Sequence, residues 1–209
     1  MTTWRGLPQA CFRHALRRAL PVLLLSLLVA MYVAAEPRAA AAALPAASES
    51  ATAALVDRVN AYRQAVGLQP LKSDPRLTQA ARAHADYYVT NRLRYGSITL
   101  AVHNEDPSWS GFTGRTPWER AAAAGYAQDD FSAEDMAFGR GPVEAVDSLM
   151  NTVWHRFAIL DLYADQLGAA VAGREDAAGD LPVVVLDTGL SGPLPQVQND
   201  FSVVYPFDG

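Results

Sequence analysis

The sequence is poor in cysteine, because Cys11 is the single one among 209 residues. It lies upstream of an apolar run, so removal of an N-terminal export signal would also remove this cysteine. The remaining chain would then have no disulfide and no thiol chemistry. A domain of about 150 residues is large enough to bury roughly two thirds of its surface without cross-links. We therefore expect a fold that its own hydrophobic core stabilises.

Common catalytic motifs are also missing from the sequence. No serine or cysteine stands in a nucleophile elbow, and no glycine-rich loop is suited to bind phosphate. No helix carries the His-Glu-x-x-His pair of zinc proteases. These absences argue against a serine or cysteine hydrolase, a nucleotide-dependent enzyme and a zinc protease of that class.

Acidic residues are absent from the N-terminal segment, where none precedes Glu36. An apolar run over residues 19–35 follows a basic region and ends in Val33-Ala34-Ala35, whose small side chains suit signal peptidase. The basic region contains Arg5, Arg13, Arg17 and Arg18. We predict a signal peptide over residues 1–35.

The alternative is that the apolar run is retained as a membrane anchor. It contains Pro21 and is short for a spanning helix, which needs about 20 apolar residues, so cleavage is the favoured interpretation. Residues 36–52, rich in alanine and proline, lack sustained apolar periodicity and are interpreted as a linker. The folded domain would then span residues 53–209. We expect a secreted, extracellular protein that contacts membrane only through an uncleaved N-terminal segment.

Positive charge is scarce once the signal is removed. Beyond residue 35 the chain keeps 13 of its 17 basic residues and all 22 acidic ones, which leaves a net charge of −9. A surface of this sign repels phosphate backbones and anionic headgroups. We therefore predict no nucleic-acid partner.

Hydrophobic periodicity predicts both helices and strands in the domain. Helical spacing occurs over residues 55–66, 75–88, 116–125 and 142–153, and alternating or continuous apolar segments typical of strands follow over residues 167–172 and 181–186. Ser73 is expected to cap the second helix, and Thr116 with Glu119 has the spacing of a capping box. Helices first and a hairpin later indicate an α+β domain with helices packed on an antiparallel sheet.

Three histidines of the domain call for different interpretations. His84 lies on the apolar stripe of a predicted helix, where a buried ring hydrogen-bonded to backbone is favoured over catalysis. His103 lies in a polar stretch too long to be an idle connection in a compact domain. His155 follows the helical pattern of residues 142–153, which breaks there, so we expect it at a helix end with its ring directed into a cleft.

Five segments, taken in order, resemble a known family. They read LVDRVNAYRQAVGLQPL, LTQAARAHADYY, HNEDP with GFTGRTPWERAAAAGY, SAEDMAFG and LMNTVWHRFAIL. This order is similar to the bacterial branch of the CAP superfamily, the cysteine-rich secretory proteins, antigen 5 and pathogenesis-related 1 proteins, over roughly residues 53–190. The resemblance implies an α-β-α sandwich with a central antiparallel sheet flanked by helices, and an open cleft that holds two histidines and two acids.

Carried over residue by residue, the resemblance places His103, Glu134 and His155 in the cleft. The fourth position is Thr152, where many eukaryotic members have glutamate, and the asparagine that follows the family's glutamate is Asp135 here. With one acid fewer, a glycosidase-like mechanism that needs two carboxylates is poorly supported. If any residue is catalytic, we expect it to be Glu134.

Three functions remain open at this point. The first is a secreted, non-enzymatic module that binds a small or lipid-like ligand in the cleft, with no required cofactor. His103 and His155 would be the ligands of a Zn²⁺ or another divalent cation if one binds. The second is a metal-assisted hydrolase with Glu134 as general base. The third is a domain that interacts with a component of the cell envelope.

Overall fold

The computed structural model of the protein describes residues 46–173 and 181–192, which all belong to one compact unit, Leu44–Gly209. The helices are α2 (Ala46–Ala65), α3 (Pro75–Tyr95), α4 (Pro117–Ala123), α5 (Pro142–Met150) and α6 (Val153–Ile159), with the short 3-10 helices η1 (Leu100–His103) and η2 (Gln128–Asp130). The strands are β1 (Lys72–Ser73), β2 (Phe131–Phe138), β3 (Gln166–Ala172) and β4 (Val183–Gly189). The predicted signal peptide, residues 1–35, lies outside the described residues.

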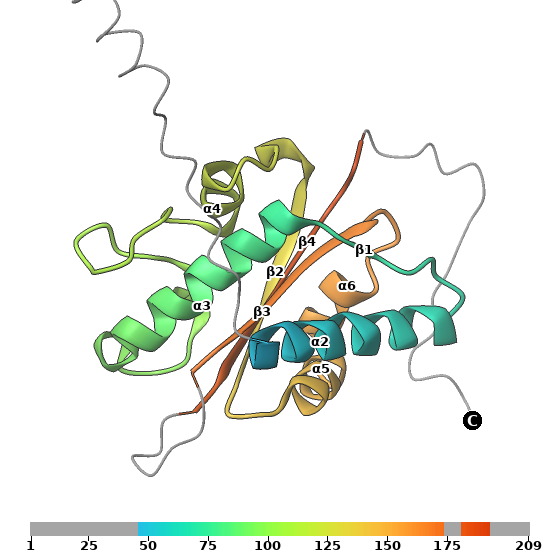
Figure 1. The fold of residues 1–209 in the computed structure, drawn as a ribbon, viewed down its shortest axis with the longest axis horizontal. Helices are drawn as coiled ribbons and strands as arrows, with labels where there is room; N and C mark the ends of the chain where they lie inside the picture. Colours follow the sequence, from blue (N-terminus) through green and yellow to red (C-terminus); the bar gives the residue numbers. More distant parts are fainter. Residues whose placement is uncertain (1–45, 174–180, 193–209) are drawn as a thin grey trace, which may run out of the picture. The chain divides into compact units, whose positions relative to one another are not determined.

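The strands form one sheet in the order β1-β3-β4-β2 (Figure 1). The three longer strands pair antiparallel, as predicted, whereas the two-residue β1 pairs parallel with β3 and makes the sheet mixed. Strand β2 is therefore an edge strand of the described sheet. The predicted α+β class, with helices on a central sheet, is confirmed.

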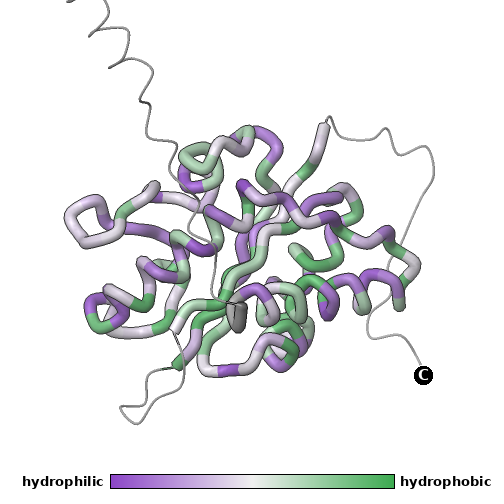
Figure 2. The backbone as a smooth tube through the Cα atoms, in the orientation of Figure 1, coloured by the Kyte–Doolittle hydropathy of each residue, from purple (hydrophilic) through white to green (hydrophobic). Residues whose placement is uncertain are grey.

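Side chains alternate between the two faces of the sheet and build a core on each. The core under α2 and α5 includes Leu55, Val59, Leu149, Met150, Leu167 and Leu186. The core under α3 includes Ala81, Ala85, Tyr88, Met136, Val183 and Val185. Figure 2 shows apolar colouring along the central strands and more hydrophilic colouring toward the periphery. The sheet is thus a middle layer between helices, as a sandwich requires.

Helix α3 packs unusually close to the sheet at Gly168 of β3. A Cβ atom at this glycine would lie 2.1 Å from the backbone carbon of Leu77 and 2.4 Å from the amide nitrogen of Thr78. Backbone cannot yield as a flexible side chain does, so the absence of a side chain at this position sets how near α3 approaches. Helix α3 carries His84, and its depth therefore helps to place the functional region.

Two predicted helix caps are corrected by the structure. Ser73 lies in β1, and the N-cap of α3 is Asp74, whose carboxylate accepts from the amides of Arg76 at 2.8 Å and Leu77 at 3.3 Å. A carboxylate accepts two amides at once, which a serine hydroxyl does less well. Thr116 is the N-cap of α4 but makes no cap bond with its side chain.

Other element boundaries also differ from the sequence prediction. The helix expected over residues 142–153 ends at Met150, and Thr152 is the N-cap of a separate helix, α6. His155 consequently lies in the first turn of α6 rather than at the end of the preceding helix. Helix α2 begins at Ala46, so the last residues of the predicted linker are helical. In the part of the chain that the structure describes, no helix is both long and apolar enough to cross a membrane.

Candidate functional site

A two-lobed cleft runs along the free edge of β2. One cavity of about 450 Å³, here called the apolar lobe, includes Val102, Met136, Phe138 and Leu149 in its lining. A second cavity of about 400 Å³, the polar lobe, is lined among others by Ser132, Glu134, Asp135 and Asp161. The two lobes share Leu100, His103 and His155.

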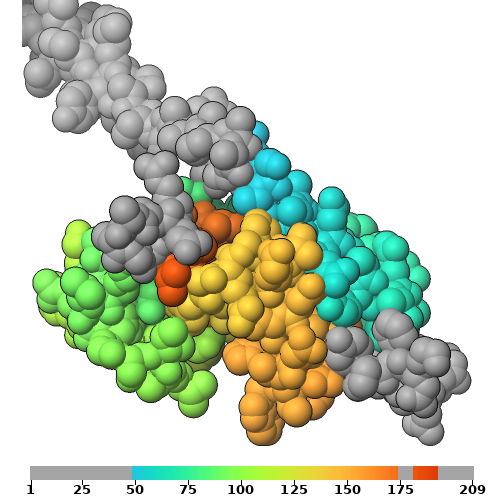
Figure 3. All heavy atoms as spheres, turned by 90° about the horizontal axis from the view of Figure 1, so that it is seen from below, coloured from blue at the N-terminus to red at the C-terminus, as the bar shows by residue number. Residues whose placement is uncertain are grey.

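The walls of this cleft come from segments distant in sequence. His103 is supplied by η1 on one side and His155 by α6 on the other, with β2 between them. Figure 3 shows the surface hollowed between the green atoms of the segment around η1 and the orange atoms of α6. The structure thus brings His103, Glu134 and His155 to one cleft, and Thr152 lines its apolar lobe. Their role in binding stays a prediction.

Glu134 lines the polar lobe, and its side chain is only 1% exposed. One carboxylate oxygen lies 2.8 Å from Nδ1 of His103, and the other accepts from Nη2 of Arg120 at 2.5 Å. Burial alone would raise the pKa of Glu134, but the interactions with His84, His103 and Arg120 outweigh it and lower the pKa to about 2. Glu134 is therefore ionised, and both of its oxygens are engaged.

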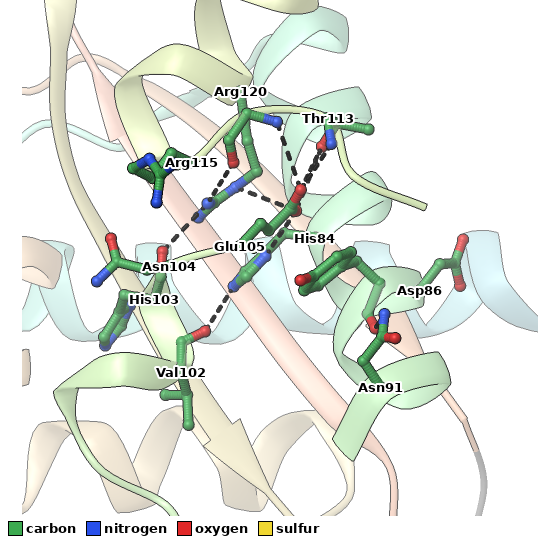
Figure 4. Close-up of polar contacts among 12 residues, drawn as sticks. His84, Asp86, Asn91, Val102, His103, Asn104, Glu105, Thr113, Arg115 and Arg120 are labelled. Atoms are coloured by element: carbon green, nitrogen blue, oxygen red, sulfur yellow. Dashed lines mark hydrogen bonds and ion pairs between the residues drawn. The ribbon is translucent and has the colours of Figure 1, made fainter. Parts of the chain in front are cut away.

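A second buried carboxylate, Glu105, lies between His84 and Thr113 (Figure 4). It lies 3.0 Å from Nδ1 of His84 and accepts from the backbone amide of Thr113 at 2.6 Å. Nε2 of His84 faces the carbonyl of Val102 at 2.9 Å, so both ring nitrogens face hydrogen-bond acceptors. The prediction that His84 is buried and bonded to backbone is confirmed.

Arg120 joins the two carboxylates into one network. Besides its bond to Glu134, its guanidinium donates to the carbonyl of His103 at 3.1 Å, and Nε lies 3.8 Å from Glu105. Removing one member of such a buried set leaves an uncompensated charge, which costs about 3–5 kcal/mol. We infer that this network holds the loop that carries His103.

Neither Glu105 nor Arg120 was predicted from the sequence. Glu105 follows His103 by two positions within the HNE motif, which is the one local signal that would have identified it. Arg120 lies in α4 among residues of a predicted capping box, and its partners are up to 17 residues away along the chain. In that box, Glu119 accepts from the amide of Arg115 at 2.7 Å, which confirms a capping role near the start of α4 rather than a catalytic one.

The ring of His155 is oriented by Thr152. The Thr152 hydroxyl donates to the carbonyl of Leu149 at 2.9 Å, so it accepts from Nδ1 of His155 at 2.6 Å. This assigns the proton of the neutral ring to Nδ1 and leaves the lone pair on Nε2. Burial, followed by the charge of His103, lowers the pKa of His155. At neutral pH the His155 ring is consequently uncharged.

The ring of His103 is likewise oriented by a hydrogen bond, which joins its Nδ1 to the ionised Glu134. For both histidines, the described residues offer Nε2 no hydrogen-bond partner. Imidazole Nε2 atoms ligate divalent cations and accept or donate hydrogen bonds to polar ligands. The two rings therefore present equivalent polar atoms at the junction of the lobes.

A high-affinity metal centre is not supported by this geometry. A catalytic zinc has three protein ligands, yet Glu134 is already paired on both oxygens. No cluster of three or more His, Cys, Asp or Glu suited to a metal occurs within residues 46–173 and 181–192. The chemistry of the donor set fits, at most, a cation held by two imidazoles.

Two further buried acids near Glu134 have raised pKa values. Asp135 is buried, and burial followed by the charge of Glu134 raises its pKa well above the usual range. Asp187 of β4 is the cross-strand partner of Glu134, and burial, the charge of Glu134 and a hydrogen bond with it raise the pKa of Asp187 likewise. Burial thus disfavours the charged form of both acids, and Asp187 was not predicted from the sequence.

Two solved structures with similar folds come from bacteria. An extracellular protein containing an SCP domain from Bacillus anthracis superposes with a TM-score of 0.50 at 15% identity, over 68% of this chain and 41% of that one. An outer surface protein from Borrelia burgdorferi gives a TM-score of 0.49 at 20% identity, over 68% of this chain and 93% of that one. At 15% identity, the likeness to the Bacillus anthracis protein shows the fold alone. A search of curated protein sequences finds no significant match.

A family model gives the assignment over most of the domain. The model of the cysteine-rich secretory protein family, CAP, matches residues 56–186. The matched region contains every residue that lines the two lobes, from Ile98 to Asp161. Sandwich, cleft and family match agree, and the chain belongs to the cysteine-rich secretory protein (CAP) family.

Proposed function

We propose that this protein is a secreted, non-enzymatic binding module whose cleft holds a ligand with an apolar part and a polar, hydrogen-bonding group. One observation carries the proposal: two oriented imidazoles, His103 and His155, line both lobes and leave their Nε2 atoms to a ligand. Such a combination of apolar lining with a few convergent polar groups is typical of ligand sites.

The apolar lobe supports a small or lipid-like ligand. Its volume of about 450 Å³ lies within the range of small-molecule sites. Its apolar lining, with Leu100 86% exposed and Ile98 62% exposed at the rim, offers surface that a ligand would remove from water. A ligand seated there would place its polar group at the two histidines.

The geometry favours binding over hydrolysis. An efficient general base has a pKa near the working pH, whereas the pKa of Glu134 is about 2 and both of its oxygens are engaged. Asp135 is turned toward the opposite face of the sheet from Glu134, and burial followed by the charge of Glu134 raises its pKa well above the usual range. The metal-assisted hydrolase therefore lacks a suitable base among the described residues.

A cell-envelope contact has separate support on the outer side of α6. Val153, Trp154 and Phe157 are 58%, 81% and 63% exposed, and a depression of about 540 Å³ lies between α6 and the segment that follows it. Exposed aromatic side chains of this kind mark interaction surfaces. Co-sedimentation with isolated cell walls, lost in a Trp154→Ser variant, would favour this second function.

Export and metal binding are also part of the proposal. The basic and apolar N-terminal pattern supports removal of residues 1–35 after export. A divalent cation such as Zn²⁺ would be held by His103 and His155, and when bound it would attract a carbonyl or carboxylate oxygen of the ligand. The protein requires no cofactor under this proposal, since the cation binds weakly and reversibly.

Calorimetric titration with Zn²⁺ tests this arrangement. We expect weak binding by the wild type, reduced at least about tenfold in His103→Ala and His155→Ala because each loses one of two ligands. Asp129→Asn, which alters an exposed acid outside the cleft, is the matched control and should bind as the wild type does. Equal affinity in all four proteins would exclude these ligands. Metal-dependent turnover that Glu134→Gln abolishes would overturn the non-enzymatic proposal.

A further inference from the structure

The backbone N–H and C=O groups of β2 point alternately toward β4 and away from it. Gly139 donates to the carbonyl of Pro182 at 2.8 Å, which continues the register in which Ala137 pairs with Val184. In an antiparallel ladder, hydrogen-bonded and non-hydrogen-bonded pairs alternate. Residues 133, 135 and 137 therefore bond to β4, and the N–H and C=O groups of residues 134, 136 and 138 point away from it.

These outward groups lie in the cleft. Glu134 lines the polar lobe, and Met136 and Phe138 line the apolar lobe. Among the described residues, no backbone or side-chain hydrogen bond is made to the outer edge of β2. Backbone polar groups that leave water without a partner are costly. A ligand that excludes water from this cleft must therefore satisfy them.

We propose that the ligand of the cleft is a short peptide in extended conformation, which adds a strand to the free edge of β2. This inference rests on the proposed binding function and names its ligand class. The outward donors and acceptors recur at every second residue, which is the repeat that an extended polypeptide presents. Main-chain pairing would supply the affinity, and the two lobes would select side chains.

A second copy of this chain does not fit the same edge. Strand β2 lies between η1 and the helices α5 and α6, which supply both walls of the cleft. The β2 edge of another copy is recessed in the same way, so the two edges cannot meet. A narrow, separate strand is the occupant that the shape admits.

Charges at the two ends of the cleft favour a particular direction. At the N-terminal end of β2, the Asp161 carboxylate accepts from Ser132 at 2.5 Å and lines the polar lobe. At the other end, Arg140 lines the apolar lobe and has no ion-pair partner among the described residues. A peptide with free ends would place its ammonium near Asp161 and its carboxylate near Arg140. It would then run parallel to β2.

The length of the cleft limits the length of the peptide. Residues 132–138 of β2 line the two lobes, and a strand rises about 3.3 Å per residue. A span of roughly 20 Å follows, which corresponds to about seven residues. We therefore expect short unblocked peptides to bind better than the same sequence within a long chain.

The test uses the unblocked heptapeptide of alternating threonine and valine, titrated by calorimetry into the full exported protein. Met136→Pro removes one outward N–H without touching a ladder bond, and proline is tolerated on edge strands. Met136→Ala is the matched control, since it loses the same side chain but keeps the N–H. Both variants lose the Met136 side chain from the apolar lobe, so they are compared with each other. We expect Met136→Pro to bind the heptapeptide at least about tenfold more weakly than Met136→Ala, and equal affinity of the two variants would overturn strand addition.

Amide hydrogen exchange on the wild type gives a second readout that needs no variant. Saturation with the heptapeptide should slow the amides of Glu134, Met136 and Phe138 at least about tenfold, because these gain strand partners. The amides of Asp135 and Ala137 are already bonded to β4 and should change less. Absence of this alternation, with the peptide bound, would overturn strand addition.

Two further comparisons separate this inference from the proposed function. If dodecanoate binds and the heptapeptide does not, the peptide inference is wrong while the binding function stands. If neither binds, both are wrong. The heptapeptide with acetylated and amidated ends should bind several-fold more weakly than the unblocked one, and equal affinity would overturn the roles given to Asp161 and Arg140.

Discussion

At the residue scale, three neighbouring carboxyl groups have pKa values shifted in opposite directions. His84, His103 and Arg120 lower the pKa of Glu134, whereas burial and the charge of Glu134 raise the pKa values of Asp135 and Asp187. One oxygen of each of these aspartates has no hydrogen-bond partner among the described residues. Because buried like charges repel strongly, the charge of Glu134 disfavours ionisation of its two neighbours. The electrostatics thus single out Glu134 as the anion that orients His103.

We expect Asp187→Asn to stabilise the protein at neutral pH. The folded-state pKa of Asp187 is raised above its unfolded value. The stability that its protonated form contributes to the fold is therefore fully present below about pH 4 and declines as pH rises toward the folded-state pKa. Asparagine cannot ionise in the unfolded state. The variant should gain unfolding free energy at pH 7 relative to the wild type, and nothing near pH 3.

Urea unfolding of both proteins between pH 3 and pH 8 measures this difference. Asp129→Asn, an exposed acid far from the network, serves as the control and should track the wild type at every pH. A stability difference for Asp187→Asn that does not vary with pH would contradict a protonated Asp187.

The sequence predicts single site residues better than their partners. His103, Glu134 and His155 were identified because the order of five motifs resembles a family, and the structure brings them to one cleft. Glu105 and Arg120 were missed because each acts through a buried contact with another element. Such pairs leave no periodic or local signal, since either residue alone resembles an ordinary surface charge.

At the element scale, strand β2 is not predicted by the apolar pattern of the sequence. Its segment contains two adjacent acids, Glu134 and Asp135, and both side chains are buried on opposite faces of the sheet. Strand patterns rely on apolar alternation, which two acids interrupt. The pair β3 and β4 was predicted because its residues are mostly apolar. The strand that matters most for the cleft was therefore the hardest to predict.

The close approach of α3 to the sheet gives an element-scale prediction. Gly168→Ala would place a methyl group 2.1 Å from the backbone of Leu77, so α3 would have to shift. We expect a loss of about 2–4 kcal/mol, at or above the usual range for overpacking. The midpoint of urea unfolding measures it. Gly192→Ala, whose added methyl group meets nothing within 4 Å, is the control. Equal midpoints for the two variants would show that α3 is free to move.

At the scale of the whole molecule, segments packed on both faces of the sheet contribute to one cleft at the open edge of β2. Helix α3 and η1 bring His103 from one side, and α6 brings His155 from the other. The cleft therefore exists only when both helical layers are packed on the sheet. This explains why the class of fold could be predicted from periodicity, whereas the cleft itself depended on the family resemblance.

The central claim is that this cleft retains a ligand through His103 and His155, and native mass spectrometry of the exported protein tests it most directly. The denatured mass should correspond to a chain that begins at Glu36. The native spectrum of the wild type should show an additional small ligand, which a His103→Ala/His155→Ala double variant loses while its circular dichroism is unchanged. The same bound mass on both proteins, or none on either after gentle purification, would contradict the account.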